Sequence, residues 1–395
     1  MLHLSIGTFV IVAFLAAGSA RRLSPFSPLM LGALAWLGVF ACGLVLGDRF
    51  YPITDRALAL WLAWFVVSGL FHLFLAGPGP MGDPAPERSL PFDYSLPLLL
   101  LVAWLLFKMR QVGLAGPAEF FSNLRLSSTE NAGLESLGPV ARFYPLVFAL
   151  FLFEHINACG ANRRRRLLLW GLMSLFALAT MGKLTALTPI LGWAVVRDVR
   201  ARLPLRRLLL LVPAVFALLF ALHLARALVG EQVALARFLG VYVYSPLVAL
   251  GYMASPVDSP FGAHVFRFAY VMWDAVIGGV SPVPVVQPYV AVPLLTNVYT
   301  VIQPFALDFG ATGVVLGAVF YGLFFGLLHR AALARRQLAL MLYGGLSMVV
   351  FGQFIGEFLF TMLSGHLQFL LAAVVIHGLA RETPPAVVPQ RREVS

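Results

Sequence analysis

The chain alternates between long apolar blocks and short runs of arginine, and this alternation limits its possible folds more than any other feature. A helix needs about 20 mainly apolar residues to cross a bilayer. Irregular backbone cannot face lipid, because unpaired amides are costly in hydrocarbon. Charged residues make up 11% of the chain, against roughly 25% in a soluble domain. We therefore predict an all-α polytopic membrane protein.

The apolar blocks predict about eleven transmembrane helices. The predicted spans cover residues 2–20, 28–47, 57–76, 90–107, 139–157, two within 167–199, then 208–225, 304–328, 337–356 and 360–378. The resulting regions are 1–228 (helices one to eight), 229–302 (an outer segment), 303–380 (helices nine to eleven) and 381–395 (a disordered cytoplasmic tail).

The block 167–199 is too long for one span. As a single helix it would be about 50 Å long at 1.5 Å per residue. It would also hold Lys183 in the bilayer, at a cost of about 2.5–3.5 kcal/mol. We predict two helices that turn at Met181-Gly182-Lys183, with Lys183 at the outer tip.

The arginine runs set the predicted orientation. Basic loops stay on the cytoplasmic side, so Arg21-Arg22 and Arg163–Arg166 are placed inside, with the N-terminus outside and the C-terminus inside. This pattern also accounts for the net charge of +11. Of the 28 lysine and arginine residues, only two are lysines. We therefore expect no binding to nucleic acid.

The segment 226–303 contains no clean span, because charged residues and four prolines within Ser281–Pro293 interrupt it. Such backbone must lie outside, in the interface or over an aqueous cavity. We predict amphipathic helices over Ala234–Met253 and Val265–Ile277.

Several cations fall on the outer side, against the insertion bias. Arginine presents a planar fork that matches phosphate oxygens, so a cluster of these side chains would bind a pyrophosphate or another acidic group. The alternative is that each arginine pairs with a carboxylate from Glu231, Asp258 or Asp274. The candidate phosphate-binding residues are Lys183, Arg125, Arg226, Arg237 and Arg267.

Metal chemistry is not indicated. The chain has no Gly-rich phosphate loop, no His-Glu zinc spacing and no cysteine cluster. Histidines within apolar helices are more often hydrogen-bonded between helices than ligands. We expect no metal site and no cofactor.

A resemblance to a known family rests on residues 296–310. Thr296-Asn297-Val298-Tyr299-Thr300, then Pro304-Phe305 and Asp308-Phe309-Gly310, resemble the Wzy-type family of O-antigen, or oligosaccharide repeat-unit, polymerases of bacterial inner membranes. Upstream, Tyr242–Leu247 extends the match, and Met181-Gly182-Lys183 is similar to a small residue followed by a cation in that family. The resemblance covers about residues 240–330.

The resemblance implies a glycosyltransferase that works at the periplasmic face of the inner membrane. It would transfer a growing glycan from its undecaprenyl-pyrophosphate carrier onto a lipid-linked repeat unit. Its partners would be this donor, this acceptor and membrane lipid, with a chain-length regulator protein as a further possible partner. Cations in a partly dry site would stabilise the charge that develops on the leaving pyrophosphate.

A base must also deprotonate the acceptor hydroxyl. Asp308 is the first candidate because it lies within the motif, and Glu357, at the turn between the last two spans, is the second. The alternative for Asp308 is a helix-capping role. Asn297, Tyr299 and Tyr244 are candidate sugar contacts, or else loop structure.

Two other functions remain open from the sequence. An O-antigen ligase shares the layout and a lipid-linked donor. A transporter or flippase of lipid-linked glycans would carry charges along a path through both leaflets, whereas the unusual charges predicted here gather at one face. The glycines of the 304–328 span favour close helix packing rather than chemistry.

Overall fold

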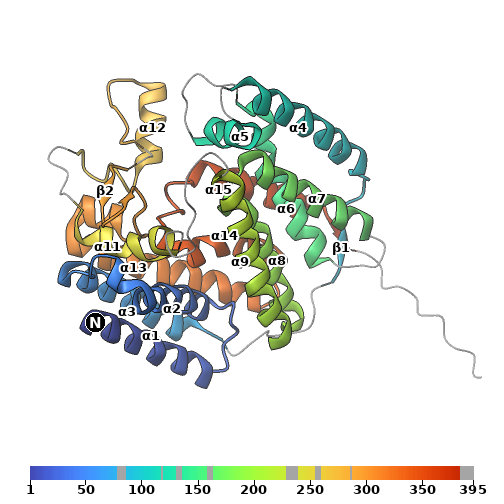
Figure 1. Ribbon diagram of the computed structural model, residues 1–395. Helices are drawn as coiled ribbons and strands as arrows, with labels where there is room; N and C mark the ends of the chain where they lie inside the picture. Colours follow the sequence, from blue (N-terminus) through green and yellow to red (C-terminus); the bar gives the residue numbers. More distant parts are fainter. Residues whose placement is uncertain are drawn as a thin grey trace, which may run out of the picture.

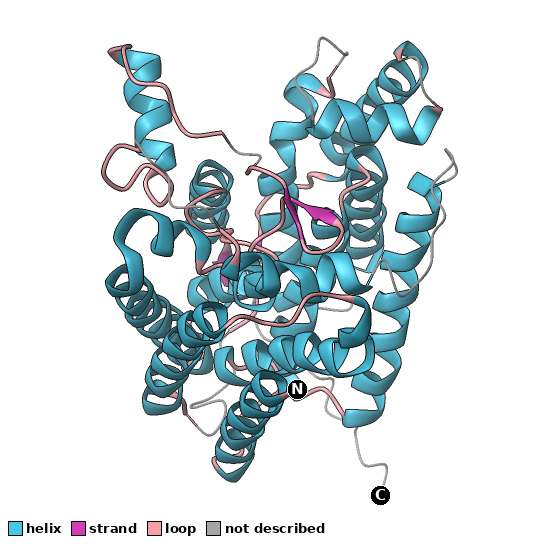
Figure 2. Cartoon of the chain, turned by 60° about the vertical axis from the view of Figure 1, so that its left-hand side comes forward, coloured by secondary structure: helices cyan, strands magenta, loops and turns pink. Residues whose placement is uncertain are grey.

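The computed structural model describes residues 1–77, 86–116, 119–129, 136–157, 163–227, 239–253, 259–284 and 287–382. These residues are mostly helical, with two short strand pairs (Figure 2). The first helices are α1 (Leu2–Ala20), α2 (Pro28–Leu46), α3 (Asp55–Leu75), α4 (Ser95–Ala115), α5 (Phe120–Thr129), α6 (Tyr144–Ile156), α7 (Arg163–Thr180), α8 (Lys183–Ala201) and α9 (Leu205–Ala227). The later ones are α11 (Ser245–Gly251), α12 (Arg267–Val276), α13 (Gln303–Leu333), α14 (Gln337–Phe351) and α15 (Leu363–Leu379).

Short elements join these helices. They are η1 (Gly47–Arg49), η2 (Gly138–Phe143), the π-helical turn η4 (Gly240–Tyr244) and η5 (Gly352–Phe354). Strand β1 (Arg88–Ser89) pairs antiparallel with β4 (Arg381–Glu382), and β2 (Val290–Ala291) pairs antiparallel with β3 (Leu295–Thr296). The predicted tail therefore begins with two ordered residues, and 383–395 lie outside the described residues.

The prediction of an all-α membrane protein is confirmed. Within the described ranges, seven helices are long and apolar enough to cross a membrane: α1, α2, α3, α4, η2 with α6, α13, and α14 with η5. The prediction had eleven spans. Two of the predicted spans outside this set are α7, which begins with four arginines, and α15, which has only 17 residues. The start of α4 moves from residue 90 to Ser95, where Asp93 accepts a 3.0 Å hydrogen bond from the Ser95 N–H.

The predicted turn at residues 181–183 is present. Helix α7 ends at Thr180 and α8 begins at Lys183. Met181 has a φ of 48°, and the Thr180 hydroxyl accepts a 3.2 Å hydrogen bond from the Gly182 N–H. The chain therefore reverses direction where a continuous helix would have held Lys183 in hydrocarbon.

Contacts between connecting segments fall into two groups. In the first group, Arg56 donates to the Met253 carbonyl and Ser128 to the Thr180 carbonyl. In the second, the Arg88 N–H donates to Asn157, which also accepts from Gln337. Figure 1 places β2 and the N-terminus at the left of the bundle and β1 at the right. We call these two sides of the bundle the N-terminal end and the β1 end.

Glycines of α13 let it pack closely on α3. A Cβ at Gly322 would lie 3.0 Å from the Ser68 carbonyl oxygen, and one at Gly326 would lie 2.7 Å from a Leu75 methyl group. Small residues at such positions let helix backbones approach each other in membranes. The packing role predicted for these glycines is confirmed at these two positions.

A second glycine contact joins α8 to α14. A Cβ at Gly344 would lie 3.3 Å from the Gly192 carbonyl oxygen and 3.2 Å from a Val196 methyl group. Gly344→Leu should lower the stability of the detergent-solubilised protein by about 1–3 kcal/mol, because the larger side chain overpacks this crossing. Thermal unfolding measures the loss. Gly171→Leu is the control, since no atom lies within 4 Å of its Cβ position; equal losses in both variants would contradict the prediction.

Helix α13 is not one straight span. Gly310 has φ 61° and ψ −150°, which breaks the helix. A Cβ at Gly317 would lie 2.7 Å from the Phe305 ring, although twelve residues of straight helix extend about 18 Å. Residues 303–309 therefore fold back over the start of the membrane helix. The predicted span starting at residue 304 is wrong in this respect, and the motif around Asp308 belongs to the folded-back part.

The first predicted amphipathic helix is also corrected. Residues 234–238 of this prediction lie outside the described residues. Residues Ser245–Leu250 are all buried, so α11 packs inside the protein instead of lying in the interface. The second forms as α12, which has no buried residue and exposes Trp273 and Val276. Exposed apolar side chains on a short helix are typical of a helix in the membrane interface.

Candidate functional site

Asp308, near the end of the folded-back residues 303–309, contacts His264. Asp308 Oδ1 lies 2.7 Å from His264 Nδ1, and Oδ2 accepts hydrogen bonds from the backbone N–H groups of Val265 (2.7 Å) and His264 (3.0 Å). The Asp308 side chain is 1% exposed and that of His264 is 11% exposed. The fold-back at Gly310 brings this carboxylate to the turn before α12.

In this geometry the His264 ring, rather than the Asp308 carboxylate, is the group that can accept a proton from a ligand. A carboxylate on Nδ1 fixes the ring orientation and places the proton there. The Nε2 lone pair of His264 is then the proton acceptor. Asp308 itself, buried and bonded to three donors, orients the ring. Sequence reasoning missed His264, because its partner lies 44 residues away.

Arg267 follows His264 by three residues and is the first residue of α12. It is half-buried, and its Nε donates a 2.8 Å hydrogen bond to the Val283 carbonyl. Among the described residues, this is the only hydrogen bond that its guanidinium group makes. Of the predicted phosphate-binding residues that the structure describes, Arg267 is the nearest in sequence to His264.

Lys183 and Arg125 belong to a second group around Tyr242. Lys183 Nζ lies 3.6 Å from the centre of the Tyr242 ring, a cation–π contact. Helix α5 brings Arg125 to the same place, since Ser128 bonds the Thr180 carbonyl at the α7–α8 turn. The pKa of Arg125 is lowered, because burial disfavours the charged guanidinium more than the nearby Tyr242 favours it. We call these three residues the Tyr242 cluster.

Helix α11 connects the surroundings of the two groups. Tyr242 is in η4, which leads directly into α11, and α11 contacts β3. In Figure 1, α11, α12 and β2, which are neighbours of these two groups in the chain, all lie on the side of the N-terminus.

Two other predicted cations cannot be placed. Arg237 lies outside the described residues, as does the side chain of Arg226. The possible carboxylate partners Glu231 and Asp258 also lie outside them, while Asp274 is exposed on α12.

The predicted sugar contacts have different surroundings. Tyr244 is 1% exposed, packs against Phe50 and donates to the Tyr51 carbonyl, so it is a core residue and the structure argues against sugar contact. Tyr299 is 6% exposed and donates a 2.8 Å hydrogen bond to the Pro288 carbonyl, and burial raises its pKa. It ties the β2–β3 region to the motif. Asn297 is half-buried in the connection after β3.

Glu357 lies at the predicted turn between α14 and α15, but its carboxylate is fully engaged. It is 6% exposed and accepts hydrogen bonds from the Tyr321 hydroxyl, the Thr361 hydroxyl, and the backbone N–H groups of Leu359, Phe360 and Thr361. A carboxylate has about four lone-pair positions. The structure therefore argues against Glu357 as the base and indicates that it organises the turn.

Among the described residues, no three His, Cys, Asp or Glu side chains gather as a metal site would require. No family model, curated protein or solved structure matches the chain.

Proposed function

We propose that this protein is a membrane glycosyltransferase that polymerises lipid-linked oligosaccharide repeat units, as the Wzy-type resemblance implies. The His264–Asp308 pair is the observation that carries the proposal, because a carboxylate-oriented imidazole suits a general base. The Tyr242 cluster supports it by adding two cations at the same end of the bundle. Donor and acceptor are undecaprenyl-pyrophosphate-linked glycans in this proposal, and the product is O-antigen or a similar surface polysaccharide.

The reaction needs one proton transfer and one leaving group. His264 Nε2 takes the proton from the acceptor hydroxyl as its oxygen bonds the anomeric carbon of the donor. The bond from that carbon to the pyrophosphate oxygen breaks, and the pyrophosphate leaves with the electron pair. Lys183, Arg125 and Arg267 stabilise the negative charge that develops on it. The proton then passes from His264 to solvent.

The proposed location is the bacterial inner membrane, with the N-terminus periplasmic and the C-terminus cytoplasmic. This orientation puts His264 and the Tyr242 cluster in the periplasm, where lipid-linked donors replace nucleotide sugars.

Gene deletion distinguishes the candidate functions. The surface glycan of the deletion strain is separated by gel electrophoresis. A polymerase defect leaves single repeat units without long chains, whereas loss of all surface glycan indicates a ligase or a transporter. Unchanged chain length would overturn the proposal.

Lys183→Ala should reduce polymerisation by about 10²-fold, the usual loss when one preorganised charge-stabilising group is removed. Lys183→Arg should retain most activity, since it keeps the positive charge. The measurement is the amount of long-chain glycan in a deletion strain that expresses each variant at equal membrane levels. Arg110→Ala, on the exposed part of α4, is the control. Full activity of Lys183→Ala would remove this residue from the site.

A transporter of lipid-linked glycans is the second candidate, because ionisable groups also lie in the bundle core. His72 and His329 are 5% and 3% exposed, and Asp198 is 4% exposed toward the β1 end. However, the cavities beside these histidines have volumes of only about 10 Å³, enough for one water molecule. Cavities of this size cannot hold a glycan, which favours the polymerase over the transporter.

A further inference from the structure

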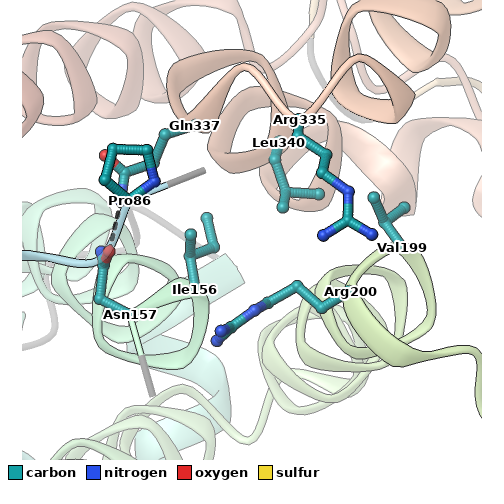
Figure 3. A pocket seen from close by; sticks show the side chains of 8 residues that line it. All are labelled: Pro86, Ile156, Asn157, Val199, Arg200, Arg335, Gln337 and Leu340. Atoms are coloured by element: carbon teal, nitrogen blue, oxygen red, sulfur yellow. Dashed lines mark hydrogen bonds between the residues drawn. The ribbon is translucent and has the colours of Figure 1, made fainter. Parts of the chain in front are cut away.

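A basic cavity lies at the β1 end, opposite the His264–Asp308 pair. It has a volume of about 180 Å³ and is lined by side chains from the ends of α6, α8 and α13, the start of α14, and the segment before β1. Arg200 and Arg335 reach into it from opposite sides (Figure 3). Two guanidinium groups beside one small cavity are suited to an anion.

Arg335 occupies a backbone position that normally favours glycine. Its φ is 56°, and α13 ends just before it, with the Arg335 N–H bonded to the Ala332 carbonyl and the Arg336 N–H bonded to the Ala331 carbonyl. Helices commonly end in this way with glycine in the left-handed residue. An arginine here carries a backbone cost, and its side chain is directed into the cavity.

Two polar atoms of the lining lack partners in the described part of the chain. Arg335 Nε and Gln337 Oε1 are both buried, and neither has a hydrogen-bond partner. Gln337 is 7% exposed, and its amide nitrogen donates a 2.6 Å bond to Asn157 (Figure 3). A buried polar group without a partner is costly. A ligand that satisfies both atoms offers an acceptor to Arg335 and a donor to Gln337.

Charge in the lining is only partly neutralised. Arg200 lies 3.6 Å from Glu87 and donates to the His155 carbonyl at 3.2 Å. That carboxylate belongs to the segment before β1 and is not part of the cavity lining. Arg335 has no ion pair among the described residues. An anion bound between Arg335 and Arg200 would therefore pair with the positive charge of Arg335.

We propose that this cavity binds the phosphate group of an anionic phospholipid whose headgroup also carries a hydroxyl, such as phosphatidylglycerol. The phosphate oxygens accept from Arg335 and Arg200, and the headgroup hydroxyl donates to Gln337 Oε1. Basic pockets between membrane helices are known to hold anionic headgroups. In the proposed orientation this end faces the cytoplasm, so the site is separate from the glycosyl-transfer chemistry.

The test uses the full-length protein, purified in detergent and depleted of lipid. Thermal unfolding is followed during titration with phosphatidylglycerol, with phosphatidylcholine, and with inorganic phosphate at constant ionic strength. Bound ligand stabilises the folded protein by mass action. Arg335→Gly is the test variant, because glycine suits the left-handed backbone and keeps the fold. Arg336→Gly is the control, since it removes the same charge from an exposed neighbour.

Phosphatidylglycerol should raise the unfolding temperature of the natural protein more than phosphatidylcholine does. Arg335→Gly should weaken that effect at least tenfold in ligand concentration, and Arg336→Gly less than twofold. If inorganic phosphate alone gives the full effect and Arg335→Gly removes it, the phosphate site stands and its ligand is free phosphate. Equal responses of both variants, or no preference for anions, would overturn the proposal.

Discussion

His264→Gln should reduce glycan polymerisation by about 10²–10⁴-fold, the range that a positioned general base contributes. Glutamine keeps a polar side chain of similar reach, but it cannot accept the proton. The measurement is the rate of chain extension with lipid-linked repeat units and purified protein in proteoliposomes. Binding of the repeat unit should change little, because the imidazole acts in proton transfer.

Asp308→Asn separates orientation from proton transfer. Asparagine keeps the shape of the side chain but offers one acceptor oxygen instead of two, so the His264 ring loses its fixed orientation. We expect a smaller rate loss than for His264→Gln, together with reduced stability of the turn before α12. His377→Gln, near the opposite end of the bundle on α15, is the control. An active His264→Gln variant would leave the proposed mechanism without a base.

Glu357→Ala should destabilise the protein by about 3 kcal/mol or more. The substitution leaves three backbone N–H groups and the Tyr321 hydroxyl without their buried acceptor, and each lost partner costs about 1–3 kcal/mol when water cannot replace it. Thermal unfolding in detergent measures the loss. Glu357→Gln should fall between alanine and the natural residue, because it keeps one acceptor oxygen.

Glu382→Ala is the matched control for this change. Its carboxylate is 63% exposed and lies 3.5 Å from Arg88, and exposed ion pairs contribute about 0–1 kcal/mol. This variant should therefore unfold almost like the natural protein. If Glu357→Ala is as stable as the natural protein but has no polymerase activity, then Glu357 has a direct role in the reaction.

Much of the fold was readable from local composition. The boundaries of α1 agree with the predicted span, and the reversal at Met181-Gly182-Lys183 was predicted from the length of the block 167–199 and the position of Lys183. Short or charged helices such as α7 and α15 were harder to classify. Their sequences resemble spans, but their lengths or their arginines fall outside the usual requirement.

The candidate site was only partly readable. Lys183 and Arg125 were selected as unusual cations, but their common neighbour Tyr242 was not. Asp308 was selected by its motif, whereas His264, whose ring this carboxylate orients, was not. Tyr244 and Glu357 carry suitable functional groups, and only their packing shows that these groups are engaged by the protein itself.

The sequence alone determined that this is an α-helical membrane protein and where its chain reverses at Lys183. That information is local, because a stretch of about 20 residues can cross a bilayer only if it is mainly apolar and leaves no backbone group unpaired. Only the tertiary structure decided that Gly310 folds the motif back and that Asp308 meets His264 across 44 residues. Such pairs depend on how helices and connections pack against one another, and hydropathy along the chain carries no record of that packing.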